Sequence, residues 1–391
     1  MSPRRMDIAP AGPVILPDTG LGRGWEPAVL LMAILLLLSF GLVSLYSASA
    51  FLAQRQDLPD YFYVLRQAGG ALVGMVVLFG CARVPYRFWR GAAWPLVAAT
   101  WLLLVVLVLP GTEAIAPEVN GARRWLKVGI TIQPSELAKF TIVVWTAMLA
   151  VKKAEHFRSF RRGLLPFLVV WGVLVLPILL EPDFSTACMV ALLGALVVFA
   201  AGGRIAHFAL LGAVALPLAW SQLGVAFRAQ RILAFLNPEA DPAGAGFQVR
   251  QSLIALGSGG LTGQGFGEGR QKFGFLPEPH NDFIFAMIGE EWGLLGVLLL
   301  VATYLTIVLV GFRVARRAPD AFGQLLAVGL TNLVALQALL HMAVGLGLVP
   351  PTGLALPLVS YGRSNLLVTL LALGVLLSIT REAEEGWSRV S

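Results

Sequence analysis

The chain has 391 residues, of which 57% are hydrophobic and only 13% are charged. A soluble domain cannot bury that much apolar surface, so the composition predicts a protein that crosses a membrane many times. Basic residues outnumber acidic ones, which gives a formal charge of +7. Because most of the basic residues stand in short segments between apolar runs, we attribute this charge to membrane topology and expect no nucleic-acid partner.

Apolar windows long enough to span a bilayer, or nearly so, follow one another along the chain. A span needs roughly 20 residues, so the shorter windows are expected to be tilted or partly re-entrant. We therefore predict an all-α polytopic membrane protein with about ten transmembrane helices. The windows lie at 27–49, 65–83, 92–110, 136–151, 164–180, 186–201, 205–224, 283–311, 322–346 and 364–380.

The positions of lysine and arginine predict the orientation. When the amino terminus is placed inside and the spans alternate, most basic residues of the connecting segments fall inside, which predicts that both termini are inside. Residues 1–26 and 382–391 are then cytoplasmic tails of a membrane domain at 27–381. Residues 225–282 form a long external loop between the seventh and eighth spans, and a loop of that length is typical of a functional segment.

The polar motifs all fall on the external side of this topology. The first is GARRWLKVGITIQPSELAKF, where Arg123, Arg124 and Lys127 crowd a short loop. Paired arginines suit phosphate or carboxylate, although basic residues beside a span also serve as headgroup anchors. Glu136 and Lys139 are three residues apart on one face of the next span, a spacing that predicts an internal ion pair.

The motif EPDFST lies between the fifth and sixth spans and contains Glu181 and Asp183. Pro182 breaks the preceding helix, and Asp183 either caps the next helix or acts directly in catalysis or metal binding. In the long external loop, FQVRQSLIALGSG is typical of a short amphipathic helix at the membrane surface. The overlapping GSGGLTGQGFG lacks the preceding strand and the following GK[ST] of a nucleotide loop, and we interpret it as flexible turns.

The end of that loop, FLPEPHND, contains Glu278, His280 and Asp282 at intervals of two residues. Pro277 and Pro279 keep the chain extended, so the three side chains are expected to share one face. The spacing is not a specific zinc signature. A structural metal and a transient Mg or Mn ion held with substrate phosphates both remain as alternatives to a site without a cofactor. Asp282 precedes a helix, so it is either an N-cap or a catalytic carboxylate.

Glu290 and Glu291 lie two turns into the following helix. Carboxylates inside a membrane span are costly, so they are usually functional or paired. We expect at least one of the two to pair with a cation inside the bundle.

Together these blocks resemble the signature segments of the SEDS family (shape, elongation, division and sporulation proteins), the FtsW and RodA glycosyltransferases of bacterial cell-wall synthesis. YSAS, PEADPAGAGFQ and the ending LLSITRE are more similar to the FtsW division branch than to the RodA elongation branch. The resemblance covers about residues 27 to 381 and rests on NGARRWLKVG with IQPSELAK, EPDFST, FLNPEADPAGAGFQVRQSLIALGSGGLTGQGFGEGRQK, FLPEPHNDFIFAMIGEEWG and PPTGLALPLVSYGRSN.

This resemblance implies a ten-helix fold that polymerises lipid II, an undecaprenyl-pyrophosphate-linked disaccharide peptide, on the outer face of the bacterial cytoplasmic membrane. It also implies a class B penicillin-binding transpeptidase as partner, together with regulatory membrane proteins of the division machinery and membrane lipids. The family's essential aspartate corresponds to Asp282. Its Arg-Arg-Trp loop and its helix-four Glu and Lys correspond to Arg123, Arg124, Trp125, Glu136 and Lys139.

The chain departs from the family pattern in the same segments. The unusual residues are Glu181 in place of Gln, Ser185 in place of Gly, Asn281 in place of Thr, and Arg363 and Asn365 in SYGRSN, where the family has SYGGSS. Arg363 is either a further phosphate contact or a sign of altered lipid or partner binding.

The implied reaction assigns different tasks to acids and cations. A sugar hydroxyl attacks the anomeric carbon of a second lipid-linked disaccharide, and Asp282 is the expected general base. The leaving pyrophosphate is already a good anion and needs cations rather than an acid. The basic residues expected to contact it are Arg123, Arg124, Lys127, Arg231, Lys272 and Arg363, with supporting roles for Glu136, Lys139, Asp183, Glu278, His280, Glu290 and Glu291.

Two other function classes stay open, namely a lipid II flippase and a non-catalytic scaffold that recruits a transpeptidase. A flippase would spread ionisable residues across the depth of the bilayer, whereas the polar motifs here fall mostly on one face, which favours the enzyme. Within the family, a RodA-type elongation polymerase is the alternative to the division type.

Overall fold

The computed structural model describes residues 24–206 except 120 and 158, residues 244–388, and a few positions between these two stretches. Most of the window predicted at 205–224 and nearly all of the predicted amino-terminal tail lie outside the described residues. The loop from 225 to 243, including Arg231, does so as well, apart from one isolated position.

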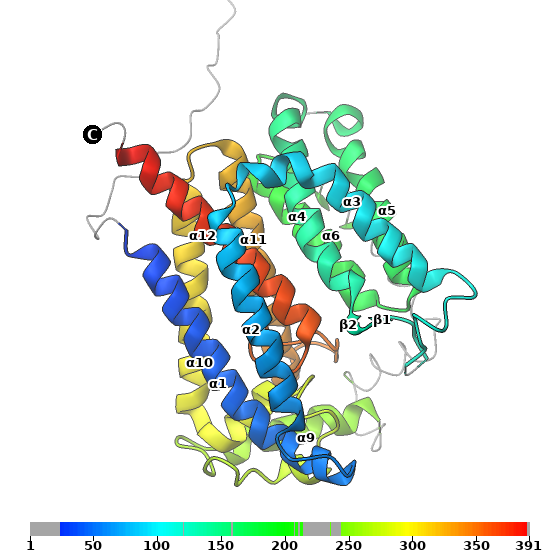
Figure 1. The fold of residues 1–391 in the computed structure, drawn as a ribbon, viewed down its shortest axis with the longest axis vertical. Helices are drawn as coiled ribbons and strands as arrows, with labels where there is room; N and C mark the ends of the chain where they lie inside the picture. The colour runs from blue at the N-terminus through cyan, green and yellow to red at the C-terminus, as the bar shows by residue number, and fades with distance from the viewer. Residues whose placement is uncertain are drawn as a thin grey trace, which may run out of the picture.

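The described chain is a bundle of apolar helices (Figure 1). Eight helices are long and apolar enough to cross a membrane, and α6 is a shorter apolar helix, so the described residues account for nine of the ten predicted windows and confirm a multi-pass helical protein. The bundle consists of α1 (Glu26–Arg55), α2 (Phe62–Arg83), α3 (Arg87–Val108), α4 (Pro134–Lys153), α5 (Leu165–Leu180), α6 (Phe184–Ala200), α10 (Ile284–Arg317), α11 (Ala321–Gly345) and α12 (Arg363–Ser388).

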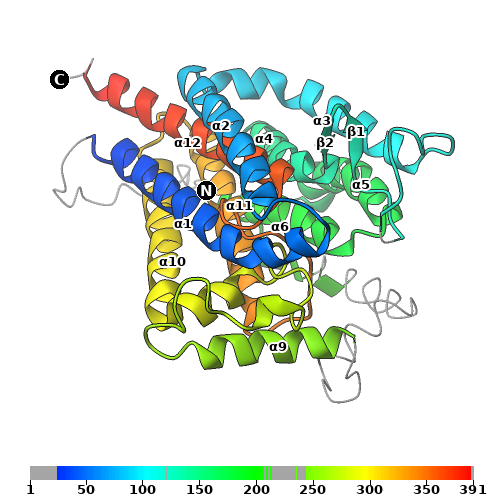
Figure 2. The ribbon, with the colours of Figure 1, turned by 60° about the horizontal axis from the view of Figure 1, so that its bottom comes forward.

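Smaller elements join these helices. Three are single helical turns, η1 (Ala154–His156), η2 (Phe160–Leu164) and η4 (Gln271–Phe273). The helix α9 (Ala245–Ser258) confirms the short helix predicted in the external loop. It lies across one end of the bundle (Figure 2).

The expectation of a purely helical fold is wrong at one place. β1 (Leu126–Val128) and β2 (Ile130–Ile132) form an antiparallel hairpin before α4. Gly129 supplies the positive φ, +71°, that the tight turn requires. The β-branched residues on both sides of this glycine favour extended backbone, so the hairpin follows from local sequence.

The helices differ in how deeply they are enclosed. In the apolar window of α4, 83% of residues are buried, because α3, α6, α11 and α12 surround it. In α2 only 22% are buried, since this helix packs against α12 and α1 and exposes Leu65, Leu72 and Val76. We infer that α2 presents its outer face to lipid and α4 forms the centre of the bundle.

The helix α10 is broken near its start. Gly293 has φ +62° and ψ −160°, values that no helix contains. The backbone groups released at the break are satisfied by the glycine-rich segment that follows α9. The Gln264 amide donates to the Glu290 carbonyl at 2.9 Å, and the Leu294 amide donates to the Gly260 carbonyl at 3.0 Å.

The glycine-rich segment forms turns, as predicted, and these turns pack closely against α10. A Cβ on Gly259 would collide with the Gly289 carbonyl, and a Cβ on Gly263, whose φ is +87°, would collide with the Glu291 carbonyl. The glycines allow two backbones to touch, so they serve close packing between the loop and α10.

Candidate active site

The polar motifs meet at the end of the bundle where α10 and α12 begin. The Tyr361 amide donates to the His280 carbonyl at 3.1 Å, which joins the segment before α12 to the segment before α10. The Gln133 amide, at the entry to α4, donates to Ser364 Oγ at 2.9 Å. The turn before α12 and the first turn of α12 together therefore connect the loop that carries Asp282 to the helix that carries Glu136.

Asp282 lies one residue before the N-cap position of the helix that follows it. The helix α10 begins at Ile284, and Phe283, the residue at its N-cap position, makes no side-chain capping hydrogen bond. The prediction that Asp282 is the N-cap residue is therefore wrong by one position. The Oδ1 atom of Asp282 is buried, and a Cβ at Gly353 would stand 3.9 Å from Oδ2, so the carboxylate faces the loop between α11 and α12.

His280 lies two residues earlier, in an aromatic cage. Its ring is 4% exposed and packs against Tyr63 and Tyr361, with ring centroids 5.0 and 5.6 Å away. Burial lowers the pKa of His280 to about 4, so the imidazole is neutral at physiological pH. Its Nδ1 has no hydrogen-bond partner among the described residues, and Nε2 lies 3.7 Å from the Glu278 carboxylate.

Glu136 and Lys139 form the ion pair that their spacing predicted, with Nζ 2.7 Å from Oε2. The ammonium also donates to Gln337 Oε1 at 2.9 Å. Asn365 Nδ2 donates to the same Glu136 oxygen at 2.8 Å, so this unusual residue of the SYGRSN motif completes a buried network. Because both charges are paired and hydrogen-bonded, the network is a stable support beneath the site.

The three basic residues before α4 do not form one cluster. Arg124 donates to the backbone carbonyls of Pro182 at 2.7 Å and Glu181 at 3.4 Å, so it fastens the hairpin region to the turn between α5 and α6. Arg123 pairs with Glu113 at 2.9 Å, a pair with an exposed carboxylate that contributes little stability. Lys127 is exposed on β1.

The turn between α5 and α6 contains two carboxylates in different states. Asp183 accepts a hydrogen bond from the Thr186 amide at 3.3 Å, which confirms the capping alternative for this residue. Glu181 is 2% exposed, and neither of its carboxylate oxygens has a hydrogen-bond partner among the described residues. Burial first, and then the charge of Asp183, raise the pKa of Glu181 to about 9 despite the opposing effect of Arg124.

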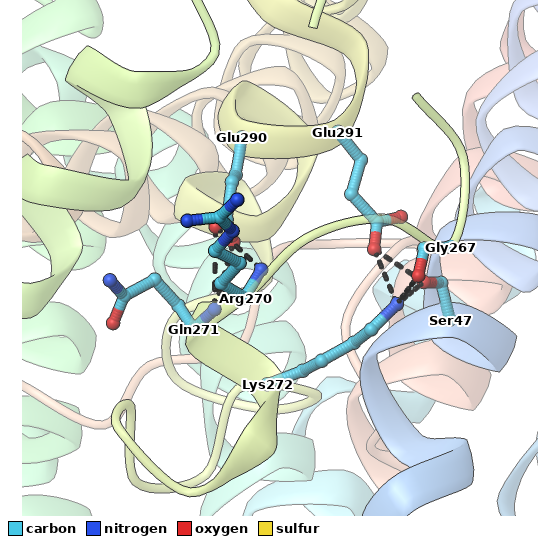
Figure 3. A network of polar contacts seen from close by, with 7 residues as sticks. All are labelled: Ser47, Gly267, Arg270, Gln271, Lys272, Glu290 and Glu291. Atoms are coloured by element: carbon cyan, nitrogen blue, oxygen red, sulfur yellow. Dashed lines mark hydrogen bonds and ion pairs between the residues drawn. The ribbon is translucent and has the colours of Figure 1, made fainter. Parts of the chain in front are cut away.

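Glu290 and Glu291 hold in place the loop that precedes α10 (Figure 3). Glu290 Oε1 accepts hydrogen bonds from the amides of Arg270 and Gln271, at 2.8 and 3.3 Å. Glu291 pairs with Lys272, with 2.9 Å between Nζ and Oε1, which confirms the predicted pairing of one of these glutamates with a cation. The Lys272 ammonium also donates to Ser47 Oγ and to the Gly267 carbonyl, so three protein acceptors already surround it.

Some parts of the arrangement were not predicted as site residues. Ser47 lies in the YSAS motif, which indicated only the branch of the family, and Gln67 and Gln337 are buried polar residues inside apolar windows. Arg363 begins α12 and its Cγ lies against Gly70 of α2. Among the described residues, no three His, Cys, Asp or Glu side chains form a group able to hold a metal ion alone.

Comparison with known proteins places this arrangement in a family. The family model for cell cycle proteins of the FtsW, RodA and SpoVE type matches residues 28–385. The chain belongs to this family. A probable peptidoglycan glycosyltransferase FtsW of Geobacter sulfurreducens is 41% identical over 358 residues, which cover 91% of this chain and 95% of the relative.

Further relatives extend the same likeness. Stage V sporulation protein E of Bacillus subtilis is 40% identical and is covered over 97% of its length, with 91% of this chain. Among solved structures, one described as structural coordination of polymerization and crosslinking by a peptidoglycan synthase complex matches with a TM-score of 0.75 and 29% identity. That match covers 93% of this chain and 99% of the other. The crystal structure of Thermus thermophilus RodA matches with a TM-score of 0.66 and 28% identity, over 93% and 99% of the two chains.

Proposed function

We propose that this protein is a peptidoglycan glycosyltransferase of the septal, FtsW type, which polymerises lipid II into glycan strands. Membership of the family and the names of its relatives support the activity. The observation that carries the assignment to a site is the turn before α12. This turn contacts the Asp282 loop, and Ser364, directly after it in α12, contacts the start of α4, so segments distant in sequence form one polar region at one end of the bundle.

Asp282 is the general base in this proposal. A sugar hydroxyl of one lipid-linked disaccharide transfers its proton to the carboxylate as it attacks the anomeric carbon of a second one. The bond from that carbon to the pyrophosphate breaks, undecaprenyl pyrophosphate leaves, and direct displacement inverts the anomeric centre.

Cations stabilise the leaving pyrophosphate. Arg123 and Lys127 are the basic residues of the hairpin region with the loosest protein contacts, so they are the first candidates for this contact. Arg124 donates to backbone carbonyls, so its proposed role is to fix the turn between α5 and α6 and not to contact the pyrophosphate. Arg363, at the start of α12, is the third candidate for the pyrophosphate.

A divalent cation such as Mg or Mn fits the proposal only together with substrate. Asp282 and Glu278 offer two hard oxygen ligands, and an ion of this kind takes its remaining ligands from phosphate and water. When bound, it would neutralise charge on the pyrophosphate. Glu278 has an exposed side chain, which leaves it accessible to such an ion.

The proposal places the active site on the outer face of the bacterial cytoplasmic membrane, with both termini inside. The charge distribution of the sequence supports this orientation. A class B penicillin-binding transpeptidase is the proposed partner, supported by the similarity to a peptidoglycan synthase complex. Regulatory membrane proteins of cell division would join the same assembly.

Conversion of Asp282 to Asn tests the proposed base. The purified protein, with its transpeptidase partner, is given lipid II, and glycan chains are resolved by electrophoresis. We expect Asp282→Asn to lower polymerisation by about a thousandfold or more, because the amide cannot accept the proton. The melting temperature in detergent should stay unchanged, because the shape of the side chain is conserved.

The matched control is Asp57→Asn, an exposed aspartate in the turn between α1 and α2 with φ +56°, which asparagine also tolerates. Full polymerisation by Asp282→Asn would overturn the assignment of the base. Transport of lipid II across vesicles without any glycan product would favour the flippase instead.

A further inference from the structure

The helix α2 contributes none of the residues predicted for the site, yet two of its side chains reach the turn before α12. Gln67 is 3% exposed, although it stands in a mostly apolar helix. Its Nε2 donates to the Ser360 carbonyl at 2.9 Å, and its Oε1 accepts from the Gly362 amide at 3.3 Å. A single side chain thus holds both sides of the turn.

Tyr63 lies one helical turn before Gln67, and residues four apart share one face of a helix. The Tyr63 ring packs against His280 at 5.0 Å and against Tyr361 at 5.2 Å. Its hydroxyl donates to Gln56 Oε1 at 2.9 Å, which ties the ring to the end of α1. The same face of α2 therefore holds both the turn and the imidazole next to it.

The turn before α12, which α2 holds in place, also holds the backbone of the two residues directly before Asp282. The Tyr361 amide donates to the His280 carbonyl, and Ser360 Oγ donates to the Asn281 carbonyl at 2.8 Å. Within the loop itself, the Asn281 and Asp282 amides both donate to the Glu278 carbonyl at 3.1 Å. The contacts from α2 and the turn before α12 add to these hydrogen bonds.

We infer that Tyr63 and Gln67 are positioning residues for the Asp282 carboxylate. They do not touch the reacting atoms. They fix the backbone of His280 and Asn281, and this backbone determines where the Asp282 carboxylate lies. This inference rests on the proposed function, because it gives α2 a part in the same reaction. A misplacement of about 1 Å can cost about a hundredfold in rate, so the loss of such a contact has a measurable effect.

The test compares three substitutions at these two positions in the full-length protein with its partner. Tyr63→Leu removes the aromatic wall of the cage, and Gln67→Leu removes both hydrogen bonds to the turn. We expect each to lower kcat about tenfold or more while KM for lipid II stays within about twofold, because binding groups are untouched. Tyr63→Phe keeps the ring and removes only the hydroxyl, so it should retain activity.

A second readout does not depend on activity. Hydrogen–deuterium exchange of the amides at 278–283 should become faster in Tyr63→Leu and Gln67→Leu, and should stay at the wild-type rate in Tyr63→Phe. The control is Leu65→Ala on the same helix, whose side chain is 65% exposed and faces away from the site. It should change neither kcat nor exchange.

The outcomes separate this inference from the proposed function. Wild-type kcat and unchanged exchange in both leucine variants would overturn the positioning role, even if Asp282 proves essential. A rise in KM at constant kcat would also overturn it, because the residues would then act in substrate binding. Failure of the wild-type protein to polymerise lipid II would overturn the proposed function, and faster exchange at 278–283 would still show that α2 holds this loop.

Discussion

Two polar regions at the same end of the bundle differ in whether their buried ionisable side chains have hydrogen-bond partners. The first, which we call the loop lock, consists of Ser47, Lys272, Glu290 and Glu291. Its glutamates accept hydrogen bonds from backbone amides, a hydroxyl or the Lys272 ammonium (Figure 3). The second is the candidate site, where both carboxylate oxygens of Glu181 and the Nδ1 of His280 have no hydrogen-bond partner among the described residues.

This difference indicates that the polar groups of the loop lock stabilise the fold, whereas those of the candidate site serve the reaction. A buried polar group without partners is costly, so a structure retains such groups mainly where they serve function. In the loop lock the Glu291 carboxylate pairs with the Lys272 ammonium and the Glu290 carboxylate accepts hydrogen bonds from backbone amides, so both buried glutamates have partners. In the candidate site, burial shifts the pKa of Glu181 and of His280 while these side chains have buried polar atoms without partners, a combination typical of reaction centres.

The largest loss of stability is expected from a substitution that breaks the loop lock. Lys272→Met leaves the Glu291 carboxylate buried without its ammonium, which should cost about 3–5 kcal/mol of stability. We expect a large loss of monodisperse protein in detergent and a lower melting temperature. The double variant Lys272→Met with Glu291→Gln removes both charges and should recover most of that loss.

The control for the loop lock is Lys152→Met, an exposed lysine near the end of α4. It should melt as the wild-type protein does. If Lys272→Met melted at the wild-type temperature and lost only activity, Lys272 would belong to the substrate site, as the sequence alone suggested, and the contrast between the two regions would disappear.

The helices were predictable from sequence because a long apolar run suffices to define a span. The windows at 136–151 and 322–346 match α4 and α11 to within two residues at each end. The Glu136–Lys139 pair was predictable for the same reason, since both residues lie on one helical face. Such features depend only on the local chain.

Features that depend on packing were not predictable. The break at Gly293 is invisible in an apolar run, because it forms only where the segment at 259–265 packs against α10. The start of α10 was placed one residue too early, and this misplacement gave Asp282 a false capping role. The partner of Glu291 lies in the folded loop, so no spacing rule could name Lys272.

An intermediate effect is expected at the arginines of the candidate site. Arg124→Ala removes two hydrogen bonds to the turn between α5 and α6, and a hydrogen bond from a charged donor contributes about 1.5–3 kcal/mol. We expect kcat/KM for lipid II to fall about tenfold or more. Arg124→Lys should not restore it, because an ammonium lacks the guanidinium fork.

The neighbouring Arg123 sharpens this test. Arg123→Ala should raise KM without a change in melting temperature, since its pair with Glu113 is exposed. Glu113→Gln releases Arg123 and should leave KM at or below the wild-type value. Equal changes in melting temperature for Arg123→Ala and Arg124→Ala would contradict the different roles of the two residues.

The smallest effect is expected at Glu181. Removal of this carboxylate should raise the melting temperature, whereas removal of a charge from the loop lock should lower it. With a folded-state pKa of about 9 against an ordinary value of 4.5, the folded protein holds a proton that the unfolded chain releases. Stability therefore falls as the pH rises from 4.5 to 9, and Glu181→Gln removes this dependence. We expect Glu181→Gln to raise the melting temperature by about 2–5 °C at pH 8 and by less at pH 6.

Glu291→Gln should lower the melting temperature, because the amide leaves Lys272 without its counter-charge. A gain for Glu181→Gln that is the same at both pH values would show that Glu181 is ionised in the folded protein, and the two regions would then differ in packing and not in charge.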